Sequence, residues 1–144
     1  MRYFIPEWDD RVDPKFDFIR DKHSKAHSED PLGNDVYMWE IFGKDVPFDG
    51  VLVSIATIQE NKSKYAKVLE GGIHRFLRLP QDFEIMADCG AFSYIDEPVP
   101  LYSTSEVLQL YSDLGFNYGV SVDHLVVPKY RDQSAERMRI TYNN

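Results

Sequence analysis

The chain has 144 residues, a formal net charge of -8 at neutral pH and 43% hydrophobic residues. This is enough for one hydrophobic core, and no run approaches the roughly 18 consecutive apolar residues of a membrane helix. So acidic a chain lacks the broad basic surface by which proteins bind nucleic acid through bulk electrostatics, and any such contact must be local. Two basic clusters are candidates, although a solvated helix face is the favoured interpretation of both: Lys62, Lys64, Lys67, His74, Arg75 and Arg78, and then Lys129, Arg131, Arg137 and Arg139.

The first residues, MRYFIPEWDD, contain no apolar segment behind a basic start, so a secretory signal is not expected. The single cysteine, Cys89, excludes an internal disulfide and cannot by itself form a cysteine-rich zinc site. We therefore expect a soluble, cytoplasmic protein that makes no contact with a membrane.

Residues 1–47 are rich in turn formers and charges, and we expect an N-terminal extension whose short elements pack on a sheet. Short ordered pieces are predicted at residues 3–5 and 16–19, and a short helix at 36–42. His23 and His27 have the spacing that places two imidazoles on one helix face, where they can bind a metal. Their surroundings are polar and show no apolar stripe, so a helix is not favoured there and no metal ligand is assigned.

From residue 48 onward, strand and helix patterns alternate. The apolar run at 48–54 predicts a strand, and Thr57 with Glu60 forms a capping-box pattern for a helix that stops at Gly71 and Gly72. Residues 83–88 then read as a buried strand that ends at Asp88.

The same pattern repeats once more along the chain. Ser103 and Glu106 form a second capping box, and the helix that it opens should end at Gly115. A strand is predicted at 118–122, closing on Asp123, and a final helix at 132–144 with Asp132 or Ser134 as its cap. Such alternation predicts an α/β fold with a parallel sheet and helical crossovers.

Asp88 and Asp123 would follow successive parallel strands and so lie on the same rim of the sheet, where α/β folds place their chemistry. The small residues after Asp88 would let a ligand approach the backbone closely. Either aspartate can also be read as a residue that merely caps the next turn or helix.

Residues 71–94 resemble the tRNA-guanine transglycosylase superfamily, in which a Gly-Gly-[Ile/Leu]-His-[Lys/Arg]-Phe element leads into a strand ending Asp-Ser-Gly-Gly-Phe. The matching residues are Gly71, Gly72, Ile73, His74, Arg75 and Phe76, and then Asp88, Cys89, Gly90, Ala91 and Phe92. Cys89 stands where the family has serine, and Ala91 where it has its second glycine. Residues 104–128 resemble the family's next helix, its Leu-Gly pair and a strand ending in an aspartate, here Asp123. The FIPEWDDRVDPKFDF run resembles the N-terminus of the DpdA-type branch, which places 7-deazaguanine bases into DNA.

The resemblance implies a partial (β/α)8 TIM-type barrel, with residues 48–144 forming its first βα units. It also implies that Asp88 is the general acid/base, that Asp123 holds the exchanged base, and that Cys89, Gly90 and Phe92 wall the pocket. The expected function is exchange of guanine for a 7-deazaguanine base in nucleic acid, with DNA favoured over tRNA. The family's nucleophilic aspartate and its zinc-binding cysteine cluster come from later segments. We therefore expect this chain to be inactive alone, to hold no cofactor itself, and to pair with a missing C-terminal half or a second copy.

Three alternatives remain open at this stage. The chain could be a non-catalytic subunit that binds 7-deazaguanine or nucleic acid and needs a catalytic partner. It could be an unrelated α/β module in which Asp88 and Asp123 cap turns. A cysteine hydrolase built on Cys89 with His74 or His124 is a further alternative, but nothing in the sequence pairs the thiol with a histidine.

Overall fold

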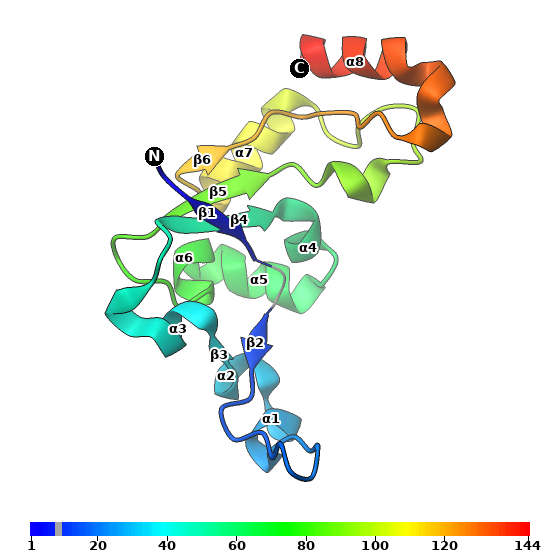
Figure 1. The fold of residues 1–144 in the computed structure, drawn as a ribbon. Coiled ribbons are helices and arrows are strands. Elements are labelled where there is room, and N and C mark those ends of the chain that lie inside the picture. The colour runs from blue at the N-terminus through cyan, green and yellow to red at the C-terminus, as the bar shows by residue number, and fades with distance from the viewer. Residues whose placement is uncertain (8–9) are drawn as a thin grey trace. The chain divides into compact units, whose positions relative to one another are not determined.

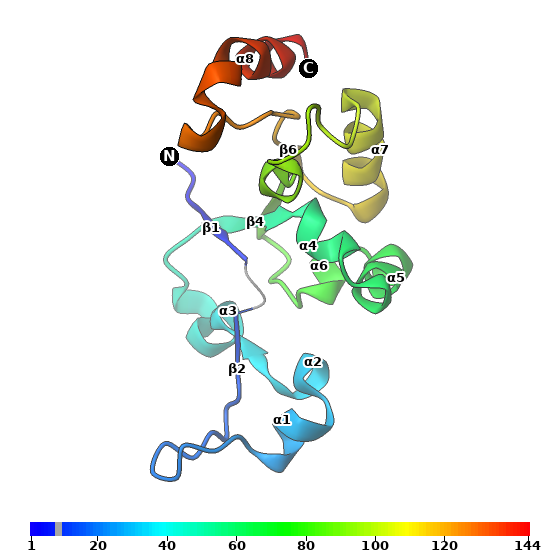
Figure 2. The same ribbon diagram turned by 90° about the vertical axis from the view of Figure 1, so that its right-hand side faces the viewer.

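The structure is a computed structural model that describes residues 1–7 and 10–144 (Figures 1 and 2). Trp8 and Asp9, part of the N-terminal stretch of the resemblance, lie outside the described residues. Internal contacts divide the chain into two units, Met1–Glu7 with Phe48–Asn144 and Trp8–Pro47, and each is presented separately below. Among the described residues, no helix has the length and apolar character needed to cross a bilayer.

The larger unit contains a parallel sheet of four strands among the described residues: β1 (Phe4–Pro6), β4 (Gly50–Ser54), β5 (Glu84–Asp88) and β6 (Tyr118–Gly119). The spatial order of the strands is β1-β4-β5-β6, so it follows their order in the chain. The expected strands at 48–54 and 83–88 are therefore present, and residues 4–6 add a strand to the same sheet (Figure 1).

The strand predicted at 118–122 is wrong in extent, because β6 ends at Gly119. The amide of Val120 still donates to the carbonyl of Ala87 (2.8 Å), one residue before β5 itself ends at Asp88. Beyond that point the partner strand offers no further ladder, so the chain continues in an irregular segment. Asp123 lies in this segment and not at the end of a strand.

The helix predicted from the Thr57 and Glu60 pattern is also different in the structure. Helix α4 (Ile55–Gln59) begins directly after β4, and a second helix, α5 (Lys62–Gly71), follows a break. The side chain of Asn61 caps α5, whereas the hydroxyl of Thr57 donates to the carbonyl of Ser54 (2.8 Å) inside α4. The break arises because the Asn61 carboxamide binds the first amides of α5 and so competes with a continuous helix.

The predicted end of the first helix at Gly71 and Gly72 and both predicted ends of the second helix are confirmed. Helix α5 ends against Gly72, and α6 (Ile73–Phe76) follows it. After β5 come the 3-10 turn η2 (Ala91–Tyr94) and α7 (Thr104–Leu114), which has the Ser103 and Glu106 capping box and ends at Gly115. The chain closes with η3 (Pro128–Gln133) and α8 (Ser134–Asn143); no side chain caps α8, so neither Asp132 nor Ser134 has the expected role.

One face of the sheet is fully buried. Val51 and Val53 of β4 are in register with Ile85 and Ala87 of β5, and none of the four is exposed. Ala87 packs in a cluster with residues of α7, which places the helical layer on this face. The alternate positions on the other face, such as Leu52 and Met86, are only partly buried.

Side chains from separate strands converge on that second face. The rings of Phe4 in β1 and Tyr118 in β6 meet edge to face at 5.9 Å between centroids, and Arg2 donates to both Glu84 (2.6 Å) and Tyr118. Gly50 makes room for this, because a Cβ there would lie 2.7 Å from the Phe4 ring and 2.1 Å from the Glu84 carbonyl. Contact between the two outer strands is what a sheet curled toward this face produces.

The smaller unit pairs β2 (Arg11–Val12) antiparallel with β3 (Val36–Tyr37), which leads into α3 (Met38–Phe42) and the 3-10 turn η1 (Gly43–Asp45). The helix predicted at 36–42 is thus a two-residue strand followed by a short helix. Two further short helices, α1 (Lys25–Glu29) and α2 (Pro31–Asn34), occupy the polar region where a helix was not favoured. Side-chain caps explain them, because Ser24 accepts from the amide of His27 and Asp30 from that of Gly33.

Candidate active site

Asp88 ends β5 beside Ser54, the last residue of β4. One carboxylate oxygen of Asp88 accepts a hydrogen bond from the amide of Gly90 (3.0 Å), so the aspartate does cap its own turn. Its other oxygen makes no hydrogen bond or ion pair with any residue in the described part of the chain. Asp88 therefore combines a fixed orientation with one oxygen left to act on a ligand.

The turn after Asp88 depends on Gly90. Its backbone has a φ of +76°, and a Cβ there would stand 2.7 Å from the Cβ of Ala56 and 3.2 Å from the hydroxyl oxygen of Ser54. The turn is consequently pressed against the end of β4. Ala91 is buried behind it, while the ring of Phe92 is 77% exposed.

Asp123 reaches the same place from the irregular segment after β6. One of its carboxylate oxygens accepts from the thiol of Cys89 (3.0 Å), and its backbone carbonyl accepts from the hydroxyl of Tyr94 (2.9 Å). The thiol and the Tyr94 hydroxyl are themselves 3.3 Å apart. Cys89, next to Asp88 in the chain and only 1% exposed, thus links the ends of β5 and of the β6 segment.

Asp88 and Asp123 both influence the pKa of the same two tyrosines. Burial raises the pKa of Tyr94, and the hydrogen bond with Cys89 and the negative charges of Asp123 and Asp88 raise it further. Burial likewise raises the pKa of Tyr111, with added contributions from the same three groups. Burial and the hydrogen bond to Asp123 raise the pKa of the Cys89 thiol, so its neutral, donating form is favoured. Within the described residues no basic side chain forms an ion pair with Asp88 or Asp123.

These contacts leave the cysteine hydrolase without support. The recorded partners of the Cys89 thiol are Asp123 and Tyr94, and neither His74 nor His124 is among them in the described structure. A catalytic thiol needs a lowered pKa, whereas that of Cys89 is raised. The backbone amide of His124 donates to the Thr141 hydroxyl (2.8 Å), and its Nε2 lies 3.0 Å from the Glu97 carbonyl.

Arg137, a member of the second basic cluster, is buried and not on the surface as expected. It is 2% exposed, and one guanidinium nitrogen donates to the carbonyls of Ile95 (2.9 Å) and Leu125 (3.1 Å). The guanidinium carbon also lies 4.0 Å from the centroid of the Tyr130 ring. Arg137 therefore ties α8 to the segment that presents Asp123, which no sequence signal indicates.

A third carboxylate near the strand ends was also missed. Glu7 follows β1 directly, is 6% exposed, and its amide donates to the carbonyl of Leu52 (2.8 Å). Its position after an apolar strand is the same signal that identified Asp88, but β1 is too short to stand out in the sequence.

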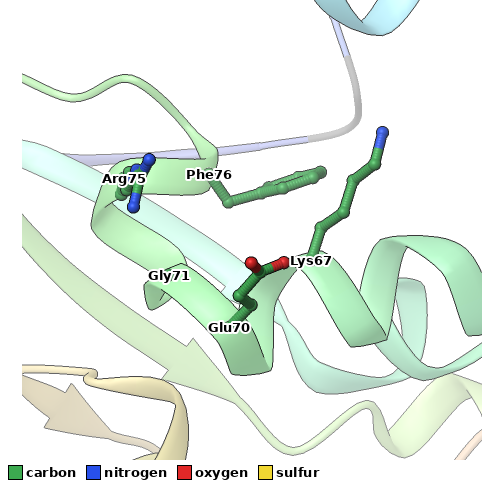
Figure 3. Close-up of a pocket in the computed structure, with 5 residues that line it drawn as sticks. All are labelled: Lys67, Glu70, Gly71, Arg75 and Phe76. Atoms are coloured by element: carbon green, nitrogen blue, oxygen red, sulfur yellow. The ribbon is translucent and has the colours of Figure 1, made fainter.

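Several other members of the two basic clusters are buried or form ion pairs, which limits how many of their charges can contact a nucleic acid. Lys64 is 5% exposed, while Lys67 and Arg75 line a surface depression of about 230 Å³ together with Glu70, Gly71 and Phe76 (Figure 3). This depression lies at the C-terminal end of α5, and because a crossover helix runs back along the sheet, that end is remote from Asp88. In the second cluster Lys129 pairs with Asp96 (2.9 Å) and Arg139 with Glu136 (2.6 Å).

No family model matches the sequence. The chain is 37% identical over 134 residues to a curated protein of Salmonella montevideo named DNA-guanine transglycosylase, an alignment that covers 88% of this chain. The chain spans about a third of that relative's length, 31%. The chain is therefore similar to a guanine transglycosylase over most of its own length.

Proposed function

We propose that this chain is the N-terminal part of a nucleic-acid guanine transglycosylase that exchanges guanine for a 7-deazaguanine base, with DNA favoured over tRNA. The observation that carries the proposal is the contact between the two segments that carry Asp88 and Asp123: the thiol of Cys89, the residue after Asp88, donates to Asp123 at 3.0 Å. The preference for DNA rests on the name of the relative and on the N-terminal resemblance.

The fold supports a partial (β/α)8 barrel. The parallel strands follow one another in chain order, as they do around a barrel and not in a doubly wound sheet. Helices cover one face, and side chains of β1, β5 and β6 converge on the other. A complete barrel takes about 250 residues, so we infer that the remaining strands, the nucleophile and the zinc cluster belong to the part of the relative that this chain does not span.

Asp88 would serve as the acid and base of the exchange. When the sugar is transferred to a carboxylate nucleophile, the bond from C1′ to the purine N9 breaks and the leaving base needs a proton. The incoming base must lose the proton on its N9 before that nitrogen attacks C1′. A carboxyl group fixed by the Gly90 amide, with its second oxygen open, suits both transfers.

Asp123 would recognise the base. A guanine-like ring presents an N1-H and an exocyclic amine side by side, and a carboxylate can accept from both. The bond from Cys89 uses one acceptor position of Asp123 and leaves the others. Because Cys89 is buried, we assign it the orientation of Asp123 and not a contact with the base, while the exposed ring of Phe92 offers a surface on which a base can stack.

A second candidate function is a non-catalytic subunit that binds the base or the nucleic acid and depends on a catalytic partner. It is favoured by the same geometry, because base recognition by Asp123 does not depend on acid/base chemistry at Asp88. In both cases we expect the isolated chain to bind a 7-deazaguanine base without turnover.

The test begins with calorimetric titration of 7-cyano-7-deazaguanine into the chain. We expect saturable binding that Asp123→Asn abolishes and the control Asp113→Asn, on the exposed side of α7, preserves. Absence of binding to the folded wild-type chain would refute base recognition. Release of labelled guanine from DNA by the isolated chain would refute its inactivity.

The acid/base role is tested in the longer protein that includes this sequence. There Asp88→Asn should reduce exchange by about 10²- to 10⁴-fold with little change in base affinity. Equal loss of affinity and rate would show that Asp88 serves binding instead. Parallel assays on DNA and tRNA decide the preferred substrate.

A further inference from the structure

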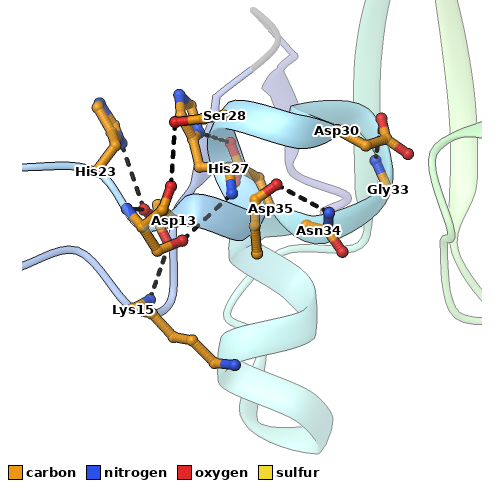
Figure 4. Close-up of polar contacts among 11 residues, drawn as sticks. Asp13, Lys15, His23, His27, Ser28, Asp30, Gly33, Asn34 and Asp35 are labelled. Carbon is orange, nitrogen blue, oxygen red and sulfur yellow. Dashed lines mark hydrogen bonds and ion pairs between the residues drawn. The ribbon is translucent and has the colours of Figure 1, made fainter.

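The smaller unit contains a cluster of metal-ligand side chains that the proposed function does not use. Asp13, His23 and His27 each offer one donor atom, and these atoms all lie within 4.8 Å of one another. The two imidazoles are stacked with ring centroids 3.8 Å apart, and His23 Nδ1 is 3.5 Å from Asp13 Oδ2 (Figure 4). All three residues belong to one unit, so their grouping does not depend on the rest of the chain.

The carboxylate is held in place by the backbone around it. Asp13 Oδ1 accepts from the amide of Lys15 (2.9 Å) and the hydroxyl of Ser24 (3.0 Å), and Oδ2 accepts from the amide of Ser24 (2.6 Å). A carboxylate oxygen has two acceptor positions, so Oδ2 retains one, on the oxygen nearest His23. Asp13 is a buried anion, and its exposed neighbour His23 closes the cluster toward solvent.

His27 has the second partner that metal-binding histidines usually show. Its Nδ1 lies 2.7 Å from Oδ2 of Asp35, a residue only 4% exposed. A carboxylate on one ring nitrogen fixes the tautomer and makes the other nitrogen a better ligand. This contact leaves Nε2 of His27 available to an ion.

The size of the unit adds an independent reason. It has about 40 residues, and among those described its buried hydrophobic residues are Tyr37 and Trp39. Domains of this length rarely bury enough apolar surface to stay folded without a disulfide, a metal or a partner. The sole cysteine, Cys89, lies in the other unit, so a disulfide cannot serve.

We propose that Asp13, His23 and His27 bind a divalent transition-metal ion of the zinc class. Two imidazoles and a carboxylate form a known zinc donor set, with a fourth position left to water or another oxygen ligand. Donor atoms at about 2.0–2.1 Å from a tetrahedral ion lie roughly 3.4 Å apart. Closing separations of up to 4.8 Å to this value requires a contraction of up to about 1.4 Å, which the half-exposed His23 can supply.

The competing explanation is a hydrogen-bonded cap without an ion. Asp13 and Ser24 would then simply order the chain before α1, and the stacked imidazoles would be packing partners. That arrangement predicts no selective affinity for transition metals and no dependence of such affinity on His23.

The test uses the tag-free 144-residue chain after treatment with a chelator. We expect Zn²⁺ to bind with 1:1 stoichiometry in calorimetry, Co²⁺ to give visible absorption of a low-symmetry site, and Mg²⁺ to produce neither signal. His23→Gln and His27→Gln should each weaken Zn²⁺ binding at least about tenfold, and Asp35→Asn about tenfold through its hold on His27. His74→Gln is the matched control, because it removes an imidazole of the other unit.

Circular dichroism of each variant distinguishes the loss of a metal ligand from the loss of folding. The exposed position of His23 makes His23→Gln the variant that should fold normally, and a folded His23→Gln protein with weakened Zn²⁺ binding supports the site. A folded wild-type chain with no saturable 1:1 binding would overturn it, as would binding that only His74→Gln weakens. Base binding at Asp123 is measured separately, so failure of the metal site and failure of the proposed function are distinguishable.

Discussion

Replacement of Arg137 by alanine tests whether α8 anchors the segment that carries Asp123. The guanidinium makes hydrogen bonds of 2.9 and 3.1 Å to the carbonyls of Ile95 and Leu125 and stacks on Tyr130 at 4.0 Å. Hydrogen bonds from a charged donor contribute about 1.5–3 kcal/mol each, and a desolvated cation-π contact about 2 kcal/mol. Allowing for non-additivity, Arg137→Ala should lower the free energy of unfolding by about 3–5 kcal/mol.

The assay is urea denaturation followed by circular dichroism, with Arg139→Ala as the matched control. Arg139 is on the same helix, but its side chain is 61% exposed and pairs with Glu136, so its loss should cost at most about 0.5 kcal/mol. Arg137→Lys should fall between the two, because a lysine cannot reproduce the planar stack on Tyr130. Equal and small effects of Arg137→Ala and Arg139→Ala would show that the buried contacts do not anchor α8.

Three further results are expected. Gly90→Ala should destabilise the chain by about 3 kcal/mol through backbone strain and a clash with Ala56. Gly115→Ala should cost only about 1 kcal/mol, because nothing lies within 4 Å of a Cβ at that position. Similar losses of stability for the two variants in urea denaturation would show that Gly90 is not crowded by Ala56. Cys89 has a raised pKa, caused first by burial and then by Asp123, so folding favours its neutral thiol: alkylation at pH 8.5 should be far slower in the folded than in the urea-unfolded chain, and stability should fall as the pH rises above about 9. Burial of Asp13 opposes its ionisation, but hydrogen bonds led by the Ser24 amide outweigh this and lower its pKa from 3.8 to about 2. The ionised Asp13 should therefore stabilise the fold fully above about pH 4, and this stabilisation should be lost toward pH 2. A stability difference between wild type and Asp13→Asn that stays constant over this pH range would disprove the expectation.

The parts of the fold that the sequence predicted well rest on interactions between near neighbours in the chain. The Ser103 and Glu106 capping box joins residues three positions apart, and Gly72 and Gly115 end their helices by their own backbone conformation. The position of Asp88 at the end of a strand could be predicted because an apolar run and the turn after it are local features.

The errors arose where a distant partner decided the outcome. β6 ends early because β5 ends, and a break at Asn61 divides the helix expected from Thr57. Likewise, the burial of Arg137 depends on carbonyls 42 and 12 residues away in the chain. Local sequence patterns carry no information on contacts between distant residues. A charged residue is therefore predicted to be exposed unless its tertiary partners are known.

For the candidate site, too, the sequence predicted the local features and the tertiary structure determined the contacts between distant residues. From the sequence alone came an aspartate at the end of a buried strand, a flexible turn after it and a second aspartate on the following strand pattern. Only the tertiary structure directed the Cys89 thiol toward Asp123, joined Tyr94 to the Asp123 carbonyl and Arg137 to the Leu125 carbonyl, and grouped Asp13 with His23 and His27. Hydrogen bonds and apolar periodicity along the chain specify the elements, whereas the packing of those elements against one another selects which polar groups meet.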